Sequence, residues 1–346
     1  MKKTSAGIMC CVLAAILAGC GGGSQSSASA PAAPAAAKIV IKFGNNGNTD
    51  PAEPQNIAME AFKKKLEESS KNAIEVQLYP AGQLGDARTQ VESVQMGTLE
   101  MADIENGPMG GFVPQAMIWD LPYLYRDLDH AHRVADGTVG DQLKKLFLEK
   151  NIRVLAFNDG GFRYFTNSKR PIKTPADMKG MKIRVMESKI MIETINGFGA
   201  TAVPMAFGEL YTALQQGTVD GQENPFNLIY SQKFFEVQKY LSLTEHFYYP
   251  RQYLISENFY KGLSEEHKKL INSIAVEACG IQRSEYAKSV QRFFDVLKEK
   301  GMQANEVDKA AFQKISLPIY PKFYASVGGG DEAAGKALIE AVIATK

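Results

Sequence analysis

Apolar and polar residues alternate at two different periods along the first part of the chain. Residues 39–43 and 74–79 alternate at every second position, which predicts two short strands. Between them, Ala58, Phe62 and Leu66 recur at helical spacing and predict an amphipathic helix. Strands that alternate with helices in this way are typical of an α/β sheet covered by helices.

The same pattern continues towards the middle of the chain. Asp86 is a candidate N-cap for a helix that runs to Met96, and Gly97 is a candidate C-terminal cap. Further strands are predicted at 99–104, 152–157 and 182–185. From Ser264 onward apolar residues follow a helical period until Gly301, which predicts one long helix able to brace two lobes. Residues 328–346 predict a final short helix.

A short internal repeat suggests two lobes of similar plan. Residues 95–100 (QMGTLE) resemble residues 215–220 (QQGTVD), and each segment predicts a helix that ends at glycine before a strand that begins at threonine. Polar residues follow each repeat, including Glu105 in the first and Asn224 in the second. Because ligands bind beyond the carboxyl ends of strands in open α/β sheets, two lobes facing each other would form a cleft there.

The N-terminal segment predicts export. Lys2 and Lys3 precede an apolar run over 6–18, which has the length of a secretory signal but is short for a transmembrane helix. The run ends in Leu-Ala-Gly-Cys at Cys20, which resembles a bacterial lipoprotein signal and implies cleavage before Cys20 and acylation of its thiol. The alternative is an ordinary signal peptide with an incidental cysteine. The Gly-, Ser-, Ala- and Pro-rich stretch up to residue 37 predicts a flexible tether.

Composition narrows the function classes. The chain of 346 residues has 39 Lys+Arg and 38 Asp+Glu, a balance that argues against a nucleic-acid partner. Four cysteines are too few for a disulfide framework, and Cys279 follows Ala275 on one helical face, as a small core residue does. The sequence lacks the common hydrolase, P-loop and zinc-protease motifs. His130 and His132 lie two residues apart and predict a solvated helix surface rather than a metal pair, so no metal or cofactor is expected.

Two arginines are the strongest candidates for ligand chemistry. Arg184 is flanked by Ile183 and Val185 on a predicted strand, and Arg163 follows the pair Gly160-Gly161. A buried arginine needs a partner, and its planar guanidinium fits a carboxylate at two points. That carboxylate could belong to an Asp or Glu of the chain or to a ligand.

Six motifs distributed over the chain are more specific. They are GQLGD at 82–86, DLPYL at 120–124, MKGMKIRV at 178–185, PMAF at 204–207, ELYTALQ at 209–215 and VDGQENP at 219–225. With these motifs the chain resembles the solute-binding proteins of tripartite ATP-independent periplasmic (TRAP) transporters over nearly all of 38–325. The resemblance implies a two-lobed α/β periplasmic-binding-protein fold with a central cleft, hinge strands and a long bracing helix. It implies no catalysis and no cofactor, and it implies partners in the small and large membrane subunits of a permease.

The resemblance also implies a division of the chain and a place in the cell. The predicted parts are a signal peptide at 1–19, a tether at 20–37, a first domain at 38–161 plus about 251–289, a second domain at 162–250 plus about 290–325, and a tail at 326–346. The protein is expected in the periplasm or at the outer cell surface, held to a membrane by a lipid on Cys20.

The resemblance carries the site over residue by residue. Arg184 matches the principal carboxylate-binding arginine, Arg163 the second arginine and Asn224 an amide that orients the ligand. Positions in or beside the site of the sialic-acid binders correspond to Asn46, Asp86, Glu105, Phe207 and His246. Two positions depart from those binders, since Pro108 replaces an arginine and Glu187 replaces an asparagine.

These departures favour a hydroxylated monoacid, such as a uronate or another sugar acid. The lost cation and the added anion disfavour sialic acid, and Glu105, Asp86 and Glu187 suit ligand hydroxyls better than a second carboxylate. The alternatives are a C4-dicarboxylate or sialic-acid binder, a ligand-sensing partner of a membrane receptor, and a periplasmic enzyme acting on sugar acids. Structural roles also stay open for individual residues: pairing of Glu105 with Arg163, a turn cap at Asn224, core packing of Phe207 and Tyr211, and a supporting position for His246.

Overall fold

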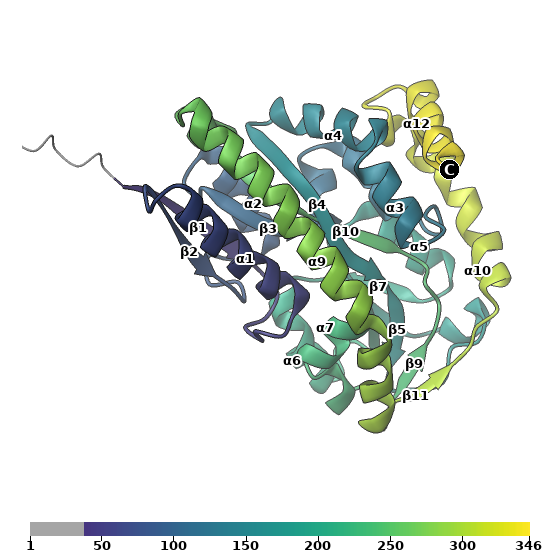
Figure 1. Ribbon diagram of the computed structural model, residues 1–346. Coiled ribbons are helices and arrows are strands. Elements are labelled where there is room, and N and C mark those ends of the chain that lie inside the picture. The colour runs from purple at the N-terminus through teal and green to yellow at the C-terminus, as the bar shows by residue number, and fades with distance from the viewer. Residues whose placement is uncertain (1–37) are drawn as a thin grey trace, which may run out of the picture. The chain divides into compact units, whose positions relative to one another are not determined.

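Two β-sheets with helices packed against them organise the part of the chain that the structure describes (Figure 1). The structure is a computed structural model, and it describes residues 38–346. The predicted signal peptide at 1–19, the tether at 20–37 and the acylation site Cys20 lie outside the described residues. The mixed α/β fold predicted from the sequence is confirmed.

The first sheet has five strands in the order β2-β1-β3-β10-β4. They are β1 (Ile39–Asn45), β2 (Ile74–Tyr79), β3 (Met101–Glu105), β4 (Ile152–Phe162) and β10 (Tyr248–Ser256). β1 is parallel to β2 and β3, whereas β10 is antiparallel to β3 and β4. Because parallel strands need crossover connections, α1 (Pro54–Ser69) joins β1 to β2, and α2 (Ala87–Met96) joins β2 to β3.

The second sheet has six strands in the order β11-β9-β5-β8-β6-β7. They are β5 (Tyr164–Asn167), β6 (Lys182–Val185), β7 (Thr201–Pro204), β8 (Gly221–Asn224), β9 (Tyr240–Ser242) and β11 (Gln303–Asn305). The parallel strands β6, β7 and β8 are connected by α5 (Lys189–Gly197) and α6 (Leu210–Gln215), as α1 and α2 connect the first sheet. We call each sheet with its packed helices the first lobe and the second lobe.

The remaining helices cover the two sheets and connect them. The α-helices are α3 (Leu128–Ala135), α4 (Thr138–Leu148), α7 (Phe226–Ser231), α8 (Glu257–Lys261), α9 (Glu265–Glu299), α10 (Lys309–Ser316), α11 (Tyr324–Val327) and α12 (Glu332–Ala344). The 3-10 helices are η1 (Gly107–Gly111), η2 (Pro114–Asp120), η3 (Pro175–Met178), η4 (Phe207–Glu209), η5 (Phe234–Glu236) and η6 (Leu317–Phe323). Within 38–346, no helix combines the length and the apolar character needed to cross a membrane.

The long helix α9 braces both lobes, as the sequence predicts. Ser264 caps its first turn. Its first half places Ile271 and Ala275 in a core of the first lobe, and its second half places Phe293 and Leu297 in a core of the second lobe. Figure 1 shows α9 passing from α1, beside the first sheet, to α7, beside the second.

The repeated segments 95–100 and 215–220 adopt the same turn. Gly97 and Gly217 both have a positive φ; α2 ends one residue before its glycine and α6 two residues before. The threonine after each glycine donates its amide to a carbonyl five residues earlier, Thr98 to Ser93 and Thr218 to Ala213, each at 2.9 Å. This bonding continues the helix end, so β3 and β8 begin at the third residue after each threonine and not at the threonine itself.

One predicted strand is much longer in the structure. The strand predicted at 152–157 continues as β4 to Phe162, although polar Asn158 and Asp159 follow the apolar part. The extension is paired with β10, and Asp159 is buried with hydrogen bonds from Tyr248 and His132. Apolar alternation could not predict this segment, because tertiary partners satisfy its polar side chains.

The chain passes between the sheets at three places. Arg163 separates β4 from β5, residues 243–247 separate β9 from β10, and α9 leads from the first lobe towards β11. The predicted domain boundaries lie near these places and stay a prediction. After α10 the chain returns to the first lobe, where Ile319 and Tyr320 join its core.

Candidate functional site

Strand ends of both sheets meet at one small cavity. β3 ends at Glu105, β6 carries Arg184 one residue before its end, and β8 ends at Asn224. The cavity is small in this structure, with a volume of about 20 Å³, far below the ~300–1,000 Å³ typical of ligand pockets. It is lined by Asn46, Gly47, Glu105, Arg163, Arg184, Met186, Phe207, Asn224, Leu228, Tyr249 and Arg251.

Arg163 is held by a carboxylate of the chain. Its Nε and Nη2 donate to the side chain of Glu223, with Nη2 at 2.9 Å from Oε1, and Nη2 also donates to the Glu223 carbonyl at 2.6 Å. Burial alone would lower the pKa of Arg163, but the charge of Glu223 and its hydrogen bonds outweigh burial and raise that pKa. The Tyr249 ring centre lies 4.4 Å from the guanidinium carbon. The remaining Nη1 is buried without a hydrogen-bond partner among the described residues.

Arg184 differs from Arg163, because its guanidinium donates hydrogen bonds only to the backbone. Its Nε and Nη2 donate to the carbonyl of Met205 at 3.0 and 2.7 Å, and its Nη1 has no partner within 38–346. No described carboxylate lies within ion-pair distance of its guanidinium, although only 2% of the residue is exposed. Burial, together with the charge of Arg163, lowers the pKa of Arg184 to about 10. A buried cation without a counter-ion is costly, and an anion in the cavity would relieve that cost.

The opposite wall of the cavity contains a third arginine whose nitrogens are all engaged. Arg251 Nε lies 3.2 Å from Asp103 Oδ2, Nη1 lies 3.2 Å from Glu105 Oε2, and Nη2 donates to the Asp103 carbonyl at 2.6 Å. Burial alone would lower the pKa of Arg251, but the charge of Asp103 outweighs burial and raises it. Asn46 donates to Glu105 Oε1 at 2.7 Å, so both oxygens of Glu105 are oriented by the chain.

Asn224 and Phe207 complete the cavity wall. Asn224 lines the cavity, and its amide nitrogen donates to the side-chain oxygen of Gln222. Phe207 is half-buried, and its ring centre lies 5.7 Å from the guanidinium carbon of Arg184. Phe207 also packs against two apolar clusters of the second lobe, and its place in the ligand site stays a prediction, as does that of Asn224.

Asp86 and Glu187 are exposed and do not line the central cavity. Asp86 is the N-cap of α2, where Oδ1 accepts from the Thr89 amide at 2.8 Å. Glu187 pairs with Arg88 at 3.2 Å across the two lobes. Both acids line a neighbouring hollow that shares Glu105, Arg184, Met186 and Phe207 with the cavity.

His246 lies behind the cavity. Its ring stacks on Phe165 at 4.1 Å between centres, and Nδ1 lies 2.8 Å from Thr244 Oγ1. Burial, with the charge of Arg163 acting in the same direction, holds the pKa of His246 well below its usual range. Nε2 faces Glu223 at 3.8 Å, so His246 contacts the partner of Arg163 and does not line the cavity.

Sequence reasoning assigned no role to three charged residues, an arginine of this cavity and two acids that contact its arginines. Arg251, Asp103 and Glu223 are buried, and all three lie on strands that end or begin at the cavity. Arg251 had the same signal as Arg184, a charge within an apolar strand. The alternative in which Arg163 pairs with an acid of the chain is correct, but the acid is Glu223 and not Glu105.

The interpretation of the two neighbouring histidines was wrong. His130 is fully buried, and its Nε2 lies 2.9 Å from the carbonyl of Val342 in α12. His132 lies 2.8 Å from Asp159 Oδ2 in β4. Each histidine faces a segment far away in the sequence, which helical periodicity alone could not indicate. Among the described residues, no cluster of three or more His, Cys, Asp or Glu side chains could hold a metal ion.

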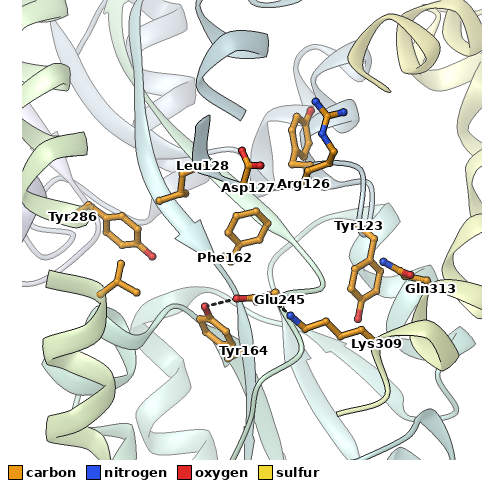
Figure 2. Close-up of a pocket in the computed structure, with 12 residues that line it drawn as sticks. Tyr123, Arg126, Asp127, Leu128, Phe162, Tyr164, Glu245, Tyr286, Lys309 and Gln313 are labelled. Carbon is orange, nitrogen blue, oxygen red and sulfur yellow. Dashed lines mark hydrogen bonds and ion pairs between the residues drawn. The ribbon is translucent and has the colours of Figure 1, made fainter. Parts of the chain in front are cut away.

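A second, wider hollow lies where the chain crosses between the sheets (Figure 2). Glu245 lies near its centre, where it pairs with Lys309 and accepts a hydrogen bond from Tyr164 at 3.3 Å. The side chains of Phe162 and Tyr286 form other parts of its wall. This hollow shares no lining residue with the cavity around Arg184.

Known proteins resemble this chain over most of its length. The family described as bacterial extracellular solute-binding protein, family 7, matches residues 46–327. The 2,3-diketo-L-gulonate-binding periplasmic protein YiaO of Escherichia coli K12 is 40% identical over 273 residues, which cover 79% of this chain and 83% of YiaO.

Solved structures agree with the sequence relatives. A TRAP periplasmic solute-binding protein from Polaromonas sp. JS666, bound to D-erythronate, has a TM-score of 0.84 and 39% identity and covers 89% of this chain and 99% of its own. A second such protein, from Roseobacter denitrificans with bound β-D-glucuronate, has a TM-score of 0.84 and 33% identity and covers 89% of this chain and 100% of its own.

Proposed function

Because the chain belongs to family 7 of the bacterial extracellular solute-binding proteins, the binding subunits of TRAP transporters, we propose that it captures a sugar acid, such as a uronate, for a TRAP permease. Its family places it outside the cytoplasm. Members of this family bind solutes and pass them on to a transporter, and the partners proposed for this chain are the small and large membrane subunits of the permease.

The observation that carries this proposal is the state of Arg184. Its guanidinium is buried at the cavity wall, its Nη1 has no partner in the described chain, and no described carboxylate pairs with it. Arg163 lines the same cavity, and its Nη1 is also buried without a partner among the described residues. Two unpaired Nη1 nitrogens, one from each guanidinium group, suit one ligand carboxylate, because charge-assisted hydrogen bonds are the strongest that the site can form.

The other wall supports the choice of a hydroxylated acid. On the first lobe, Asn46 and Glu105 supply an amide and a carboxylate that accept hydrogen bonds from hydroxyl groups, and Asn224 of the second lobe supplies a further amide. The relatives named above bind 2,3-diketo-L-gulonate, D-erythronate and β-D-glucuronate, each of which is an acid with one carboxylate and several oxygen substituents.

We propose that the ligand stabilises the closed state by contacting both lobes. Its carboxylate would meet Arg184 and Arg163 on the second lobe, while its hydroxyls meet Glu105 and Asn46 on the first. Contacts made only when the lobes are together favour the closed state by their differential affinity. Direct contacts between the lobes support the same state, since Asn48 donates to Ser231 at 2.9 Å.

A thermal-shift screen of purified residues 38–346 tests the proposal. Uronates, aldonates, sialic acid and C4-diacids are compared, and a ligand at about 100 times its Kd adds about 2.7 kcal/mol to the unfolding free energy. We expect stabilisation by sugar acids that Arg184→Ala abolishes and Arg184→Lys only partly restores, because lysine has no planar fork.

The matched control is Arg133→Ala, which removes an exposed arginine of α3 and should leave the ligand shift unchanged. Stabilisation by succinate-like diacids alone would show that the ligand class is wrong. Unchanged ligand binding by Arg184→Ala would show that the site is wrong.

We further propose that Cys20 carries a lipid that holds the mature protein at a membrane. This proposal rests on the residues Leu17-Ala18-Gly19-Cys20 and the tether-like composition that follows them. A lipid anchor would keep the binding lobes near the permease while the tether lets them reach it.

A further inference from the structure

Three arginines line the cavity, but only two of them can bind an additional anion. Arg163 and Arg184 each keep an unpartnered Nη1 among the described residues. By contrast, every nitrogen of Arg251 is bonded to Asp103, Glu105 or Asn46. The third arginine is therefore neutralised by the chain and cannot offer a free fork to a ligand.

The formal charges make the two ends of the cavity opposite in sign. At one end the two cations Arg163 and Arg184 face one directly paired carboxylate, Glu223. At the other end the single cation Arg251 is paired with two carboxylates, Asp103 and Glu105. One end thus has an excess of positive charge and the other an excess of negative charge.

Glu105 is the acid that the ligand would meet at the negative end. It lines the cavity, whereas Asp103 does not, and it is 6% exposed. Asn46 and Arg251 each bind one of its oxygens, at 2.7 and 3.2 Å, and fix the direction of its carboxylate. A carboxylate has about four acceptor positions, so Glu105 keeps capacity to accept from a ligand hydroxyl.

From this arrangement we infer that Glu105, positioned by Arg251 and Asn46, selects acids with a hydroxyl at the end remote from Arg184 and rejects diacids. A second carboxylate there would face Glu105 with no free cation to offset it. Like charges brought together in a desolvated site are strongly unfavourable. A hydroxyl of the same reach would donate to Glu105 instead. This inference rests on the proposed function and narrows its ligand class.

Pairs of ligands that differ only at the remote end test it. D-Erythronate and meso-tartrate differ by one CH₂OH that becomes a carboxylate, and D-gluconate and D-glucarate differ in the same way. We expect calorimetric titration of the wild-type protein to give at least tenfold tighter binding of the monoacid in whichever pair binds. Equal affinity within that pair would overturn the inference and leave the proposed function intact.

Substitution then assigns the selectivity to Glu105. Glu105→Gln keeps the shape and removes the charge, so the monoacid-to-diacid ratio should fall by tenfold or more. Glu105→Asp keeps the charge and should keep the ratio while affinity falls. Glu277→Gln, which removes an exposed charge of α9, should leave the ratio within about twofold of wild type.

Each remaining outcome is also decisive. An unchanged ratio in Glu105→Gln would show that Glu105 does not select. If Glu105→Gln fails to fold, the wild-type ratio still confirms or overturns the discrimination. If no organic acid binds the wild-type protein, the proposed function fails and this inference fails with it.

Discussion

Three buried arginines of one cavity have different roles because their neighbours differ. Two nitrogens of Arg163 donate hydrogen bonds to Glu223. The guanidinium of Arg251 is paired with acids of its own sheet. Arg184 donates only to a backbone carbonyl. A guanidinium stays charged in all three environments. Whether an arginine here can bind an anion therefore depends on whether the chain already supplies its guanidinium with a carboxylate, and not on the number of arginines.

The buried acid Asp120 lets us predict how the unfolding free energy depends on pH. Asp120 is buried, accepts a hydrogen bond from Ser188 of the second lobe at 2.6 Å, and accepts another from Asn106 at 2.9 Å. Burial raises the pKa of Asp120 from 3.8 to about 6. Between these pH values the folded protein holds a proton that the unfolded chain has released, so the unfolding free energy falls as pH rises.

We expect Asp120→Asn to remove this part of the pH dependence. A pKa change from 3.8 to about 6 corresponds to about 3 kcal/mol. Urea unfolding at several pH values between about 4 and 7 should show the wild type losing up to that amount relative to the variant. The surface substitution Asp141→Asn serves as the control, and its curve should run parallel to wild type. Parallel curves for Asp120→Asn as well would contradict the assignment.

At the scale of elements, two glycines at the end of β4 let aromatic residues approach the backbone. A Cβ on Gly160 would lie 1.7 Å from a ring carbon of Tyr249, the residue whose ring faces Arg163. A Cβ on Gly161 would lie 1.7 Å from the hydroxyl oxygen of Tyr286 in α9, and Gly161 has a φ of +94°. Close packing of β4, β10 and α9 at the crossing between the lobes therefore depends on glycine.

Gly161→Ala should be markedly destabilising, by roughly 2–4 kcal/mol, because it combines backbone strain with a steric clash. Gly180→Ala is the matched control, since Gly180 has a φ of +77° but no atom within 4 Å of its added Cβ. That control should lose only about 1–2 kcal/mol from the backbone term. The unfolding free energies of the two variants are compared by denaturant unfolding. Equal decreases would show that the clash with Tyr286 does not destabilise the fold.

At the scale of the whole molecule, capture of an anion has to be local. The chain has a formal charge of +1 and would have −1 after removal of a signal peptide that contains Lys2 and Lys3, so long-range steering of an anion is weak. On the proposed function, the unpaired Nη1 groups of Arg184 and Arg163 would supply the attraction at short range. Contacts between the lobes, such as Arg88 with Glu187 at 3.2 Å, then act at the rim of the cleft.

Anchoring is the other property of the whole molecule that can be tested. We expect the full-length chain, expressed in a bacterial host, to partition into detergent and to give an intact mass for a lipidated chain that begins at Cys20. Cys20→Ala should lose the lipid mass, whereas Cys279→Ala should keep it, because Cys279 is buried in α9. An unmodified wild-type chain would contradict the lipoprotein interpretation.

The residue pattern by itself determined the alternation of strands and helices in the first part of the chain, the long helix, and several helix ends. Helix caps such as Asp86, Ser264 and Gly97 act through bonds to residues a few positions away, so local sequence contains the information. The repeated Gly-Thr turns are local for the same reason. Arg184 could also be singled out, because a charge within an apolar strand is unusual wherever the strand packs.

Only the tertiary structure decided which charges remain available. Arg163 is bonded to Glu223 at a separation of 60 residues, and Arg251 to Asp103 at a separation of 148. Burial of His130 against α12 and the extension of β4 to Phe162 depend on contacts of the same long range. Side-chain chemistry can be read along a chain, but pairing depends on distance in space, and folding sets that distance.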